Sequence, residues 1–421
     1  MHVTIAGGGI GGLTTALCLH AKGVDVTVYE VVRAMEPLGV GINLLPHAVA
    51  VLGRLGLIEA LAESGIETQE LILFSKHGKE IWREPRGRHA GYPVPQYSIR
   101  RGVFQSLLLA TATERLGAGS IRTGMGYRRH QAADDGLDIW FEDRTTGAQV
   151  GPIRTDCLIG ADGIHSAVRR SFYPSEGPPR WSGAVLWRAA VETEPFLSGA
   201  SMIMAGHADQ KLVAYPISEA ARRRGRSLTN WIAELRLGRP GAPPPTRESW
   251  SKPGRFEDFM PRFQDWTFDW LDFPALAAMT PQTFEFPMVD RDPVAAWSFG
   301  RATLLGDAAH PMYPVGSNGA SQAILDAEAL AVCMGGADGD VEGALKAYEA
   351  ERLPMTAALV AANRKQGPEE VMQIVETRAP NGFERLEDVI SRGELEAIAA
   401  KYKQIAGFDP ASVSKVAQSA D

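Results

Sequence analysis

The chain of 421 residues is poor in cysteine and has no long apolar segment. Its three cysteines, Cys18, Cys157 and Cys333, stand far apart and form no C-x-x-C pair, which argues against a disulfide framework and a zinc site. No stretch approaches the roughly 18 uncharged residues that a membrane-spanning helix needs. The apolar N-terminus has no basic leader and is interrupted by glycines, unlike a secretion signal. We therefore expect a cytoplasmic protein with no membrane partner.

Basic residues are also in the minority. Lys and Arg number 43 against 50 Asp and Glu, and the net charge of −7 gives no electrostatic reason to expect nucleic acid as a partner. The nine histidines are scattered, and the sequence shows no H-E-x-x-H, P-loop or Ser-His-Asp arrangement, so we expect no metal site. The length exceeds what one hydrophobic core usually serves, which favours two intimately packed domains.

The first chemical signal is a strand–helix–strand pattern at the N-terminus. Residues 2–6 read as a strand, residues 13–21 as a helix that Gly23 ends, and residues 24–30 as a second strand. Between the first strand and the helix, Gly7, Gly9 and Gly12 form G-x-G-x-x-G, with Gly11 in the same turn. This arrangement predicts a dinucleotide-binding site.

Each glycine of this motif has a physical role. Gly7 permits the tight turn, Gly9 lets the backbone approach a pyrophosphate, and Gly12 lets the helix pack closely on the strand. The pyrophosphate would lie on the free N–H groups at the positive end of the helix dipole. Glu30 closes the second strand, where its carboxylate can accept a hydrogen bond from a ribose hydroxyl. The alternative, a glycine-rich turn with no ligand, leaves these features unexplained, but the motif alone does not distinguish FAD from NAD.

Two distant segments repeat one construction. Residues 156–169 read as an apolar strand that runs into Asp162 and then a helix start, and residues 302–311 read as another strand that runs into Asp307. Each strand thus carries an acid to its carboxyl end, which is the edge of an open α/β sheet where ligands bind.

These segments, together with residues 348–354 and 362–364, resemble the single-component flavoprotein aromatic hydroxylases of the para-hydroxybenzoate hydroxylase type. The resemblance extends to about residue 365. Further stretches are similar to the phenazine-hydroxylating branch of that family, namely residues 37–43, 84–87, 95–99 with 101–102, 212–217, 287–293 and 316–325. Many members carry Gly-Gln-Gly where this chain has Gly316, Ser317 and Asn318, and we interpret this departure as a mark of the branch.

The resemblance implies a site for non-covalently bound FAD. Carried over residue by residue, the cofactor-binding positions are Gly7, Gly9, Gly11, Gly12, Glu30, Gly41, Ile42, Arg101, Met125, Asp162, Asp307, Pro314, Gly316, Asn318, Gly319 and Ala320. Arg101 would reach the phosphates, and its alternative is the neighbouring Arg100. For Met125, whose backbone would touch adenine, the alternative is core packing.

The same resemblance implies an FAD- and NAD(P)H-dependent monooxygenase that hydroxylates a small aromatic or N-heteroaromatic substrate, with or without a carboxyl group. NADH or NADPH would bind transiently, and a flavin C4a-hydroperoxide formed with O₂ would transfer oxygen to the ring. Pro314 and Gly316 would form the backbone environment of C4a, and the following helix N-terminus would stabilise negative charge near N1. His310 fits a hydrogen-bonded structural role better than that of a base. The alternatives are a flavin reductase or dehydrogenase of the same fold, or a non-enzymatic dinucleotide-binding protein.

The expected fold is α/β, with a Rossmann-like FAD-binding domain, an interleaved substrate-domain sheet and a helical tail. We expect residues 1–180 and 291–365 to form the FAD-binding domain, with some sheet segments near residues 70–100 on the substrate side. Residues 181–290 are expected to form the substrate-domain sheet, and residues 366–421 the helical tail. Candidate substrate-lining residues, each with ordinary packing as the alternative, are Trp187, Arg188, Tyr215, Met288 and Tyr313. The arginines at 222, 223, 224 and 226 fit a solvated turn better than an anion site. The tail either caps the core or contributes to a dimer, so the chain is expected to be a monomer or a homodimer.

Overall fold

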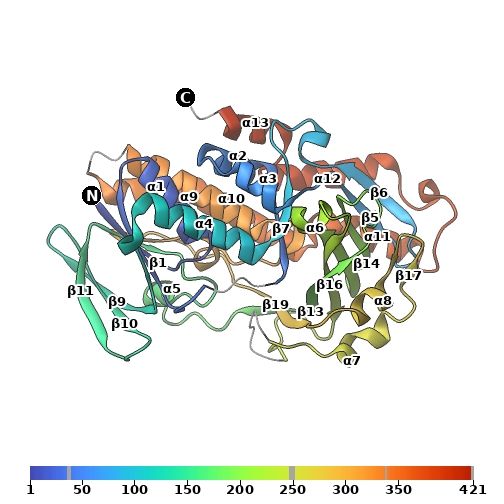
Figure 1. Cartoon of the computed structure of the whole chain (residues 1–421), viewed down its shortest axis with the longest axis horizontal. Helices are drawn as coiled ribbons and strands as arrows, with labels where there is room; N and C mark the ends of the chain where they lie inside the picture. The colour runs from blue at the N-terminus through green and yellow to red at the C-terminus, as the bar shows by residue number, and fades with distance from the viewer. Residues whose placement is uncertain (36–38, 246–251, 337–338, 419–421) are drawn as a thin grey trace.

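The computed structural model describes residues 1–35, 39–245, 252–336 and 339–418. Its first layer, in which Figure 1 labels β1, is a five-stranded parallel sheet in the order β20-β12-β1-β2-β8. The strands are β1 (His2–Ala6), β2 (Asp25–Glu30), β8 (Ile121–Thr123), β12 (Cys157–Gly160) and β20 (Ala302–Leu304). Because all five run in one direction, their carboxyl ends meet at the same edge.

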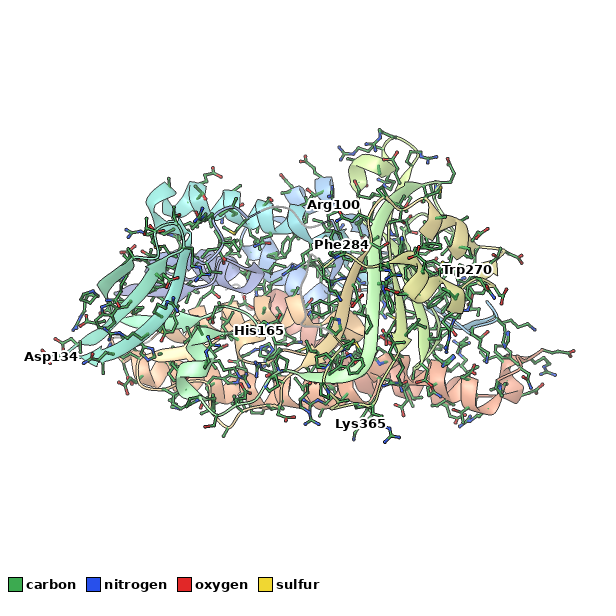
Figure 2. The ribbon with its side chains drawn as sticks, turned by 90° about the horizontal axis from the view of Figure 1, so that it is seen from below. Arg100, Asp134, His165, Trp270, Phe284 and Lys365 are labelled. Carbon is green, nitrogen blue, oxygen red and sulfur yellow. The ribbon has the colours of Figure 1, made fainter. Side chains whose placement is uncertain are left out.

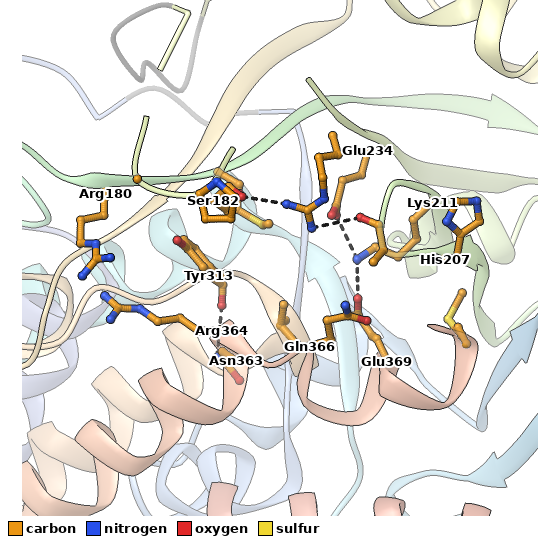
Figure 3. A pocket seen from close by; sticks show the side chains of 17 residues that line it. Arg180, Ser182, His207, Lys211, Glu234, Tyr313, Asn363, Arg364, Gln366 and Glu369 are labelled. Atoms are coloured by element: carbon orange, nitrogen blue, oxygen red, sulfur yellow. Dashed lines mark hydrogen bonds and ion pairs between the residues drawn. The ribbon is translucent and has the colours of Figure 1, made fainter. Parts of the chain in front are cut away.

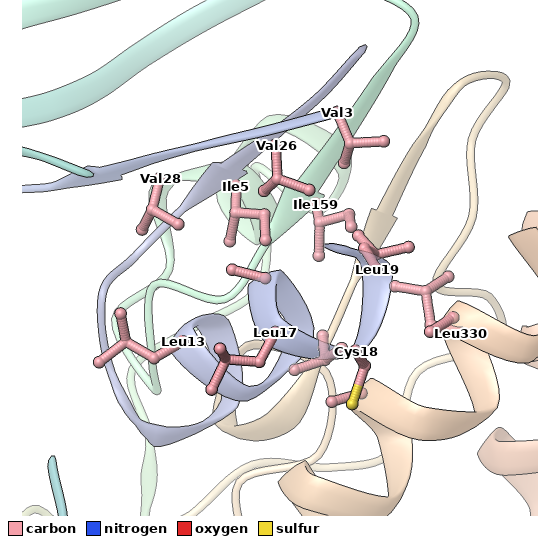
Figure 4. Close-up of a cluster of buried hydrophobic side chains, with 14 of the residues drawn as sticks. Val3, Ile5, Leu13, Leu17, Cys18, Leu19, Val26, Val28, Ile159 and Leu330 are labelled. Atoms are coloured by element: carbon pink, nitrogen blue, oxygen red, sulfur yellow. The ribbon is translucent and has the colours of Figure 1, made fainter. Parts of the chain in front are cut away.

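The core of this layer joins the sheet to four helices. They are α1 (Ile10–Ala21), α4 (Arg101–Leu116), α9 (Gly319–Gly335) and α10 (Val341–Arg364), and α1 packs against both α4 and α9. Val3, Ile5 and Val26 of the strands meet Leu13 and Leu17 of α1 in a fully buried cluster (Figure 4). Each such side chain contributes about 1.5–3 kcal/mol by its burial, so the packing fixes how α1 sits on the strands.

The second layer is a seven-stranded sheet in the order β19-β13-β16-β15-β14-β5-β6. The strands are β5 (Glu70–Phe74), β6 (Glu80–Pro85), β13 (Arg180–Thr193), β14 (Ser201–His207), β15 (Gln210–Pro216), β16 (Ser227–Arg236) and β19 (Phe284–Asp290). The sheet expected within residues 181–290 is present here as β13, β14, β15, β16 and β19. β5 and β6 come from much earlier in the chain and join through the parallel pairing of β5 with β14.

Both faces of the seven-stranded sheet are covered. On the outer face, Trp187 and Trp231 pack with Phe259 and Phe273 from α7 (Phe256–Phe259) and α8 (Phe273–Ala278), and the Trp187 and Phe259 rings are 5.5 Å apart. On the inner face, a second cluster that includes Tyr215 packs against α11 (Glu370–Arg378) and α12 (Arg392–Ala406). Successive residues of a strand point to opposite faces, so Trp187 and Arg188 face different layers.

Smaller elements complete the fold. The remaining strands are β3 (Gly41–Leu44), β4 (Ile66–Glu67), β7 (Tyr97–Arg100), β9 (Met125–Ala133), β10 (Gly136–Asp143), β11 (Gln149–Thr155), β17 (Thr267–Phe268) and β18 (Leu271–Asp272). The remaining α-helices are α2 (Pro46–Arg54), α3 (Ile58–Ser64), α5 (Ala167–Phe172), α6 (Glu219–Arg222) and α13 (Pro410–Gln418). β9, β10 and β11 form a meander whose tip, Asp134, lies at one end of the molecule (Figure 2).

The C-terminal tail is helical and caps the inner face, which agrees with the expectation that the tail caps the core. Leu386, Val389, Ile390, Leu395 and Ile398 all contact the inner-face cluster. The arginine-rich segment begins at the last residue of α6 and continues into a turn, and Arg222, Arg223 and Arg224 are exposed. Arg222 pairs with Glu219 and Arg224 with Glu192, which confirms the solvated turn. Among the described residues, none of the helices combines the length and apolar character of a membrane span.

Truncation of the outer-face tryptophan tests the assignment of faces. Because Trp187 is packed among aromatic rings, Trp187→Ala should lower the free energy of unfolding by about 3–5 kcal/mol, measured by urea denaturation. A loss below about 1 kcal/mol would contradict the burial of this side chain.

Candidate functional site

The carboxyl edge of the parallel sheet brings the sequence-predicted segments together. Gly7 N–H donates to the carbonyl of Tyr29 at 2.7 Å, and Ala161 N–H donates to that of Ala6 at 2.8 Å. Leu305 N–H donates to the carbonyl of Gly160 at 2.9 Å. These bonds continue the strand pairing by one residue beyond the strand ends. The glycine-rich turn, Glu30, Asp162 and Asp307 therefore leave the sheet side by side.

The glycine-rich turn has the geometry that a dinucleotide needs. Gly7 has φ +112°, and a Cβ there would lie 2.3 Å from the carbonyl oxygen of Ala161. A Cβ on Gly12 would lie 2.0 Å from the carbonyl oxygen of Gly7, so this position requires glycine, and one on Gly11 would lie 2.9 Å from the Leu305 side chain, which would have to shift. A Cβ on Gly9 would meet no heavy atom within 4 Å. Gly9 is thus the position that faces open space, as the approach of a pyrophosphate requires.

The start of α1 is open to an anion. Gly9 is its N-cap, no side chain caps the helix, and the first turn carries no acidic residue. The carboxylate of Glu30 instead accepts hydrogen bonds from Gly8 N–H at 2.6 Å and Val32 N–H at 2.9 Å, which fixes it beside the turn. The positive end of the helix dipole is therefore left for a ligand, with a held carboxylate next to it for a ribose.

Asp307 and Arg101 lie in front of this edge, where their charges interact. The Asp307 residue exposes much of its surface although its carboxyl lies deep among protein atoms, so the exposed surface belongs to a concave region. Burial raises the pKa of the Asp307 carboxyl, while the charges of His310 and Arg101 oppose that shift. Arg101 opens α4, and burial lowers the pKa of its guanidinium. A carboxylate in this position can accept hydrogen bonds from hydroxyl groups, and a guanidinium can bind phosphates.

Asp326, which the sequence did not indicate, holds the Asp307 turn in place. Its carboxylate, on α9, accepts hydrogen bonds from Gly306 N–H at 3.1 Å and from Arg352 Nε at 2.8 Å, and it pairs with His310. Burial alone would raise the pKa of Asp326, but His310 and Arg352 outweigh burial and lower it to about 2. The structural role expected for His310 is confirmed by this pair.

Asp162 and Met125 take more local positions. The Asp162 carboxylate accepts hydrogen bonds from Ser166 and from Ala167 N–H, so it caps the start of α5, and burial raises its pKa. Met125 is partly buried against the core just past β8, whose Thr123 pairs with Glu30. Both residues follow the carboxyl ends of strands, β12 and β8, without a contact that by itself marks cofactor binding.

The loop before α9 presents a second open helix start. Pro314 is exposed between the buried Tyr313 and Val315, and Gly316 has φ +64°. Asn318 is the N-cap of α9 but makes no capping hydrogen bond, and a Cβ on Gly319 would meet no atom within 4 Å. Ala320 follows in the first turn and is half-buried. The α9 N-terminus is therefore free to face negative charge on a bound ligand.

Gly41 links the two layers. A Cβ there would lie 2.8 Å from the ring of Tyr215, and its N–H donates to Asn230 Oδ1 at 2.7 Å. Ile42, the next residue of β3, is partly buried against the first core. Arg188 lies over the Phe286 ring at 4.6 Å on the inner face, and burial lowers its pKa to about 9, with a further contribution from Arg101.

A cavity of about 150 Å³ lies between the inner face and the end of α10 (Figure 3). Met288, Tyr313 and Val315 line its apolar side. Its polar side includes Lys211, which is buried between Glu234 at 3.0 Å and Glu369. Four of the five candidate substrate residues thus lie toward the inner face or its cavity, whereas Trp187 lies on the outer face. Among the residues described, no cluster of His, Cys, Asp or Glu could hold a metal ion.

Two neighbouring glycines make a matched pair for mutation. Gly9→Ala meets open space, so the protein without cofactor should keep its stability within about 0.5 kcal/mol while FAD affinity falls about tenfold or more. Gly12→Ala drives a Cβ into the Gly7 carbonyl and should cost about 1–3 kcal/mol of stability even without cofactor. Urea denaturation and FAD titration measure both effects. Equal losses of stability in the two variants would contradict the geometry of the turn.

The buried Asp326 carboxylate predicts a pH-dependent stability. Asp326→Asn leaves Arg352 buried without its anion and should cost about 3–5 kcal/mol at neutral pH. A carboxyl whose pKa is lowered by folding stabilises the protein above its unfolded pKa and loses that contribution as the pH falls through the folded value. The difference in stability between the two proteins should therefore be full above about pH 4 and shrink toward pH 2. A difference that stays constant over this range would contradict the assignment.

Comparison with known proteins identifies the family. The family model described as "FAD binding domain" matches residues 1–236 and 277–363. A phenazine 1,6-dicarboxylic acid hydroxylase of Lysobacter antibioticus is 46% identical over 407 residues, covering 96% of each chain. A 3-amino-4-hydroxybenzoate 2-monooxygenase of Streptomyces platensis is 33% identical, covering 92% of this chain and 94% of the relative.

The fold comparison agrees with the sequence comparison. A salicylate hydroxylase solved with its substrate has a TM-score of 0.74 at 21% identity, covering 99% of this chain and 98% of that one. The matched segments contain the glycine-rich turn, Asp162, Asp307 and the α9 start, which are the features that the carboxyl edge brings together. This chain therefore belongs to the FAD-binding domain family, in its aromatic-hydroxylase branch.

Proposed function

We propose that this chain hydroxylates a planar, carboxylated N-heteroaromatic acid of the phenazine class, with NADH or NADPH as the reductant. FAD-dependent aromatic monooxygenation is the activity of its family, so the flavin reductase and non-enzymatic alternatives are set aside. The observation that carries the substrate class is the 46% identity, over almost the full length of both chains, to an enzyme named for a phenazine dicarboxylic acid.

Different residues at the carboxyl edge suit different parts of the FAD molecule. The α1 start and Glu30 suit the pyrophosphate and adenosine ribose, Arg101 suits the phosphates, and Asp307 suits the ribityl chain. Bound FAD would supply hydride acceptance from NAD(P)H and the activation of O₂. The chain would hold the flavin ring between Gly41 and the start of α9. The free N–H groups of α9 would favour negative charge on the side of the flavin ring that faces them.

The charge of the inner face favours an anionic substrate. Arg188 and Arg101 are two buried cations, and the charge of Arg101 acts on Arg188. Burial lowers the pKa of both guanidinium groups. The pyrophosphate would serve Arg101, whose charge already interacts with Asp307. The planar guanidinium of Arg188 matches a carboxylate in two-point geometry. Phe286, over whose ring Arg188 lies, packs against the apolar cluster that contains Met288 and Val315, and these apolar side chains suit an aromatic ring.

Location and assembly follow as part of the proposal. Reduction by NAD(P)H fits a cytoplasmic enzyme, because that is where the reductant is supplied. We propose that the chain acts as a monomer or homodimer, since the cleft is built from one chain.

A substrate panel tests the proposal. NADH and NADPH oxidation by the FAD-loaded protein should be stimulated most by phenazine mono- and dicarboxylic acids, and less by hydroxybenzoates and by unsubstituted phenazine. Mass spectrometry with isotope-labelled O₂ should find one labelled oxygen atom in the product, with or without loss of the carboxyl group. Stimulation by hydroxybenzoates alone would refute the substrate class, and unlabelled product would refute oxygen transfer.

Arg188→Met should raise KM for the carboxylated phenazine by about tenfold to a hundredfold, as expected for a lost charge-assisted hydrogen bond. The KM for unsubstituted phenazine should stay unchanged. Arg180→Met, which removes an exposed guanidinium paired with Asp292, is the matched control. A rise in KM in the Arg180 variant alone would place the carboxylate at Arg180, which lines the cavity of Figure 3, and would contradict the role of Arg188.

A further inference from the structure

The ring of Tyr402, on α12, lies directly under the loop that precedes α9. The residue is 4% exposed. A Cβ on Gly316 would lie 2.1 Å from the Tyr402 hydroxyl oxygen, and one on Gly367 would lie 2.6 Å from its ring. Glycine at both positions therefore makes room for this one side chain. The contact joins the C-terminal tail to the loop that faces the cofactor cleft.

The Tyr402 hydroxyl is the centre of a buried hydrogen-bond network. It accepts from Asn318 Nδ2 at 2.8 Å, and Oδ1 of Asn363 at 2.8 Å and the carbonyl of Val315 at 3.2 Å are the acceptors for its proton. The amide of Asn318 also donates to the carbonyl of Gly316 at 3.0 Å. One phenol thus fixes both ends of the turn, with burial keeping the hydroxyl neutral by raising its pKa.

A second anchor holds the same turn from the side of the substrate sheet. The carboxylate of Glu369 lies near the backbone of Gly316, which opposes the rise in its pKa that burial causes, and it is paired with Lys211 of β15. Because Lys211 also pairs with Glu234 of β16, the turn is tied to the sheet as well as to the tail. Tyr402 and Glu369 both follow residue 363, where the family match ends.

The conformation of the turn explains why it needs these anchors. Gly316 has φ +64° and Ser317 has φ +60°, two successive residues in the left-handed region. For a residue with a side chain this conformation costs roughly 1–2 kcal/mol and persists only where neighbours impose it. The turn sets the direction of the first N–H groups of α9, and a preformed direction is what makes such groups effective toward developing charge.

We propose that Tyr402 is a positioning residue that sets the turn at residues 316–318 and thereby the alignment of the α9 N–H groups with the flavin ring. The inference rests on the proposed function for the presence of the flavin there. Tyr402 acts through Asn318 and the backbone of the turn, and it does not itself touch the substrate.

The test compares Tyr402→Phe with Tyr92→Phe. Tyr92 lies in the same buried cluster, and its hydroxyl donates to the carbonyl of Phe408 at 2.7 Å, away from the turn. Both variants lose one buried hydroxyl and keep the ring. In the protein without FAD, amide hydrogen exchange at residues 316–320 should become about tenfold faster in Tyr402→Phe and stay unchanged in Tyr92→Phe.

In the FAD-loaded protein, Tyr402→Phe should retain its FAD while the flavin absorption spectrum and midpoint potential shift, and Tyr92→Phe should match the wild type. Unchanged exchange and an unchanged potential in Tyr402→Phe would overturn the proposal, and so would equal changes in both variants. If the wild-type protein binds no FAD, the proposed function fails, whereas the exchange measurement still decides whether Tyr402 sets the turn.

Discussion

The structure depends on the parallel pairing of β20, β12, β1 and β2. Four backbone segments from three distant parts of the chain end in register, and the hydrogen bonds of Gly7, Ala161 and Leu305 carry the pairing one residue further. Without this alignment the glycine-rich turn, Glu30 and Asp307 would belong to separate regions. With it, they form one edge at which a single long ligand can contact all of them.

Two helix starts give this edge its chemical character. Neither α1 nor α9 is capped by a side chain, and neither has an acid in its first turn. The positive ends of both dipoles are thus left free, and we propose that one serves the pyrophosphate and the other the charge on the flavin ring. The protein stabilises the arrangement from behind, through Asp326 under the Asp307 turn and through Tyr402 under the α9 turn. The site is therefore built on groups that are themselves fixed by buried hydrogen bonds.

Local sequence patterns predicted the parts of this edge well. Residues 2–6 form β1 with the predicted bounds because a β-branched run ends directly at a glycine. The helix starts at Ile10, three residues before the predicted start, because Gly11 and Gly12 pack inside its first turn. The face of Trp187 was not predictable, since β13 is buried on both sides and shows no alternation of polar and apolar residues. Asp326 and Tyr402 had no sequence signal, because their roles come from contacts between segments tens of residues apart.

The central claim is that one FAD molecule spans the whole edge, from the α1 start to the α9 start. Amide hydrogen exchange measured during an FAD titration tests this most directly. The account predicts slower exchange at the α1 start, the α4 start, the Asp307 turn and the α9 start, all saturating together at one FAD per chain. Slower exchange at the α1 start alone would contradict it, because the ligand would then be held only by its ADP half.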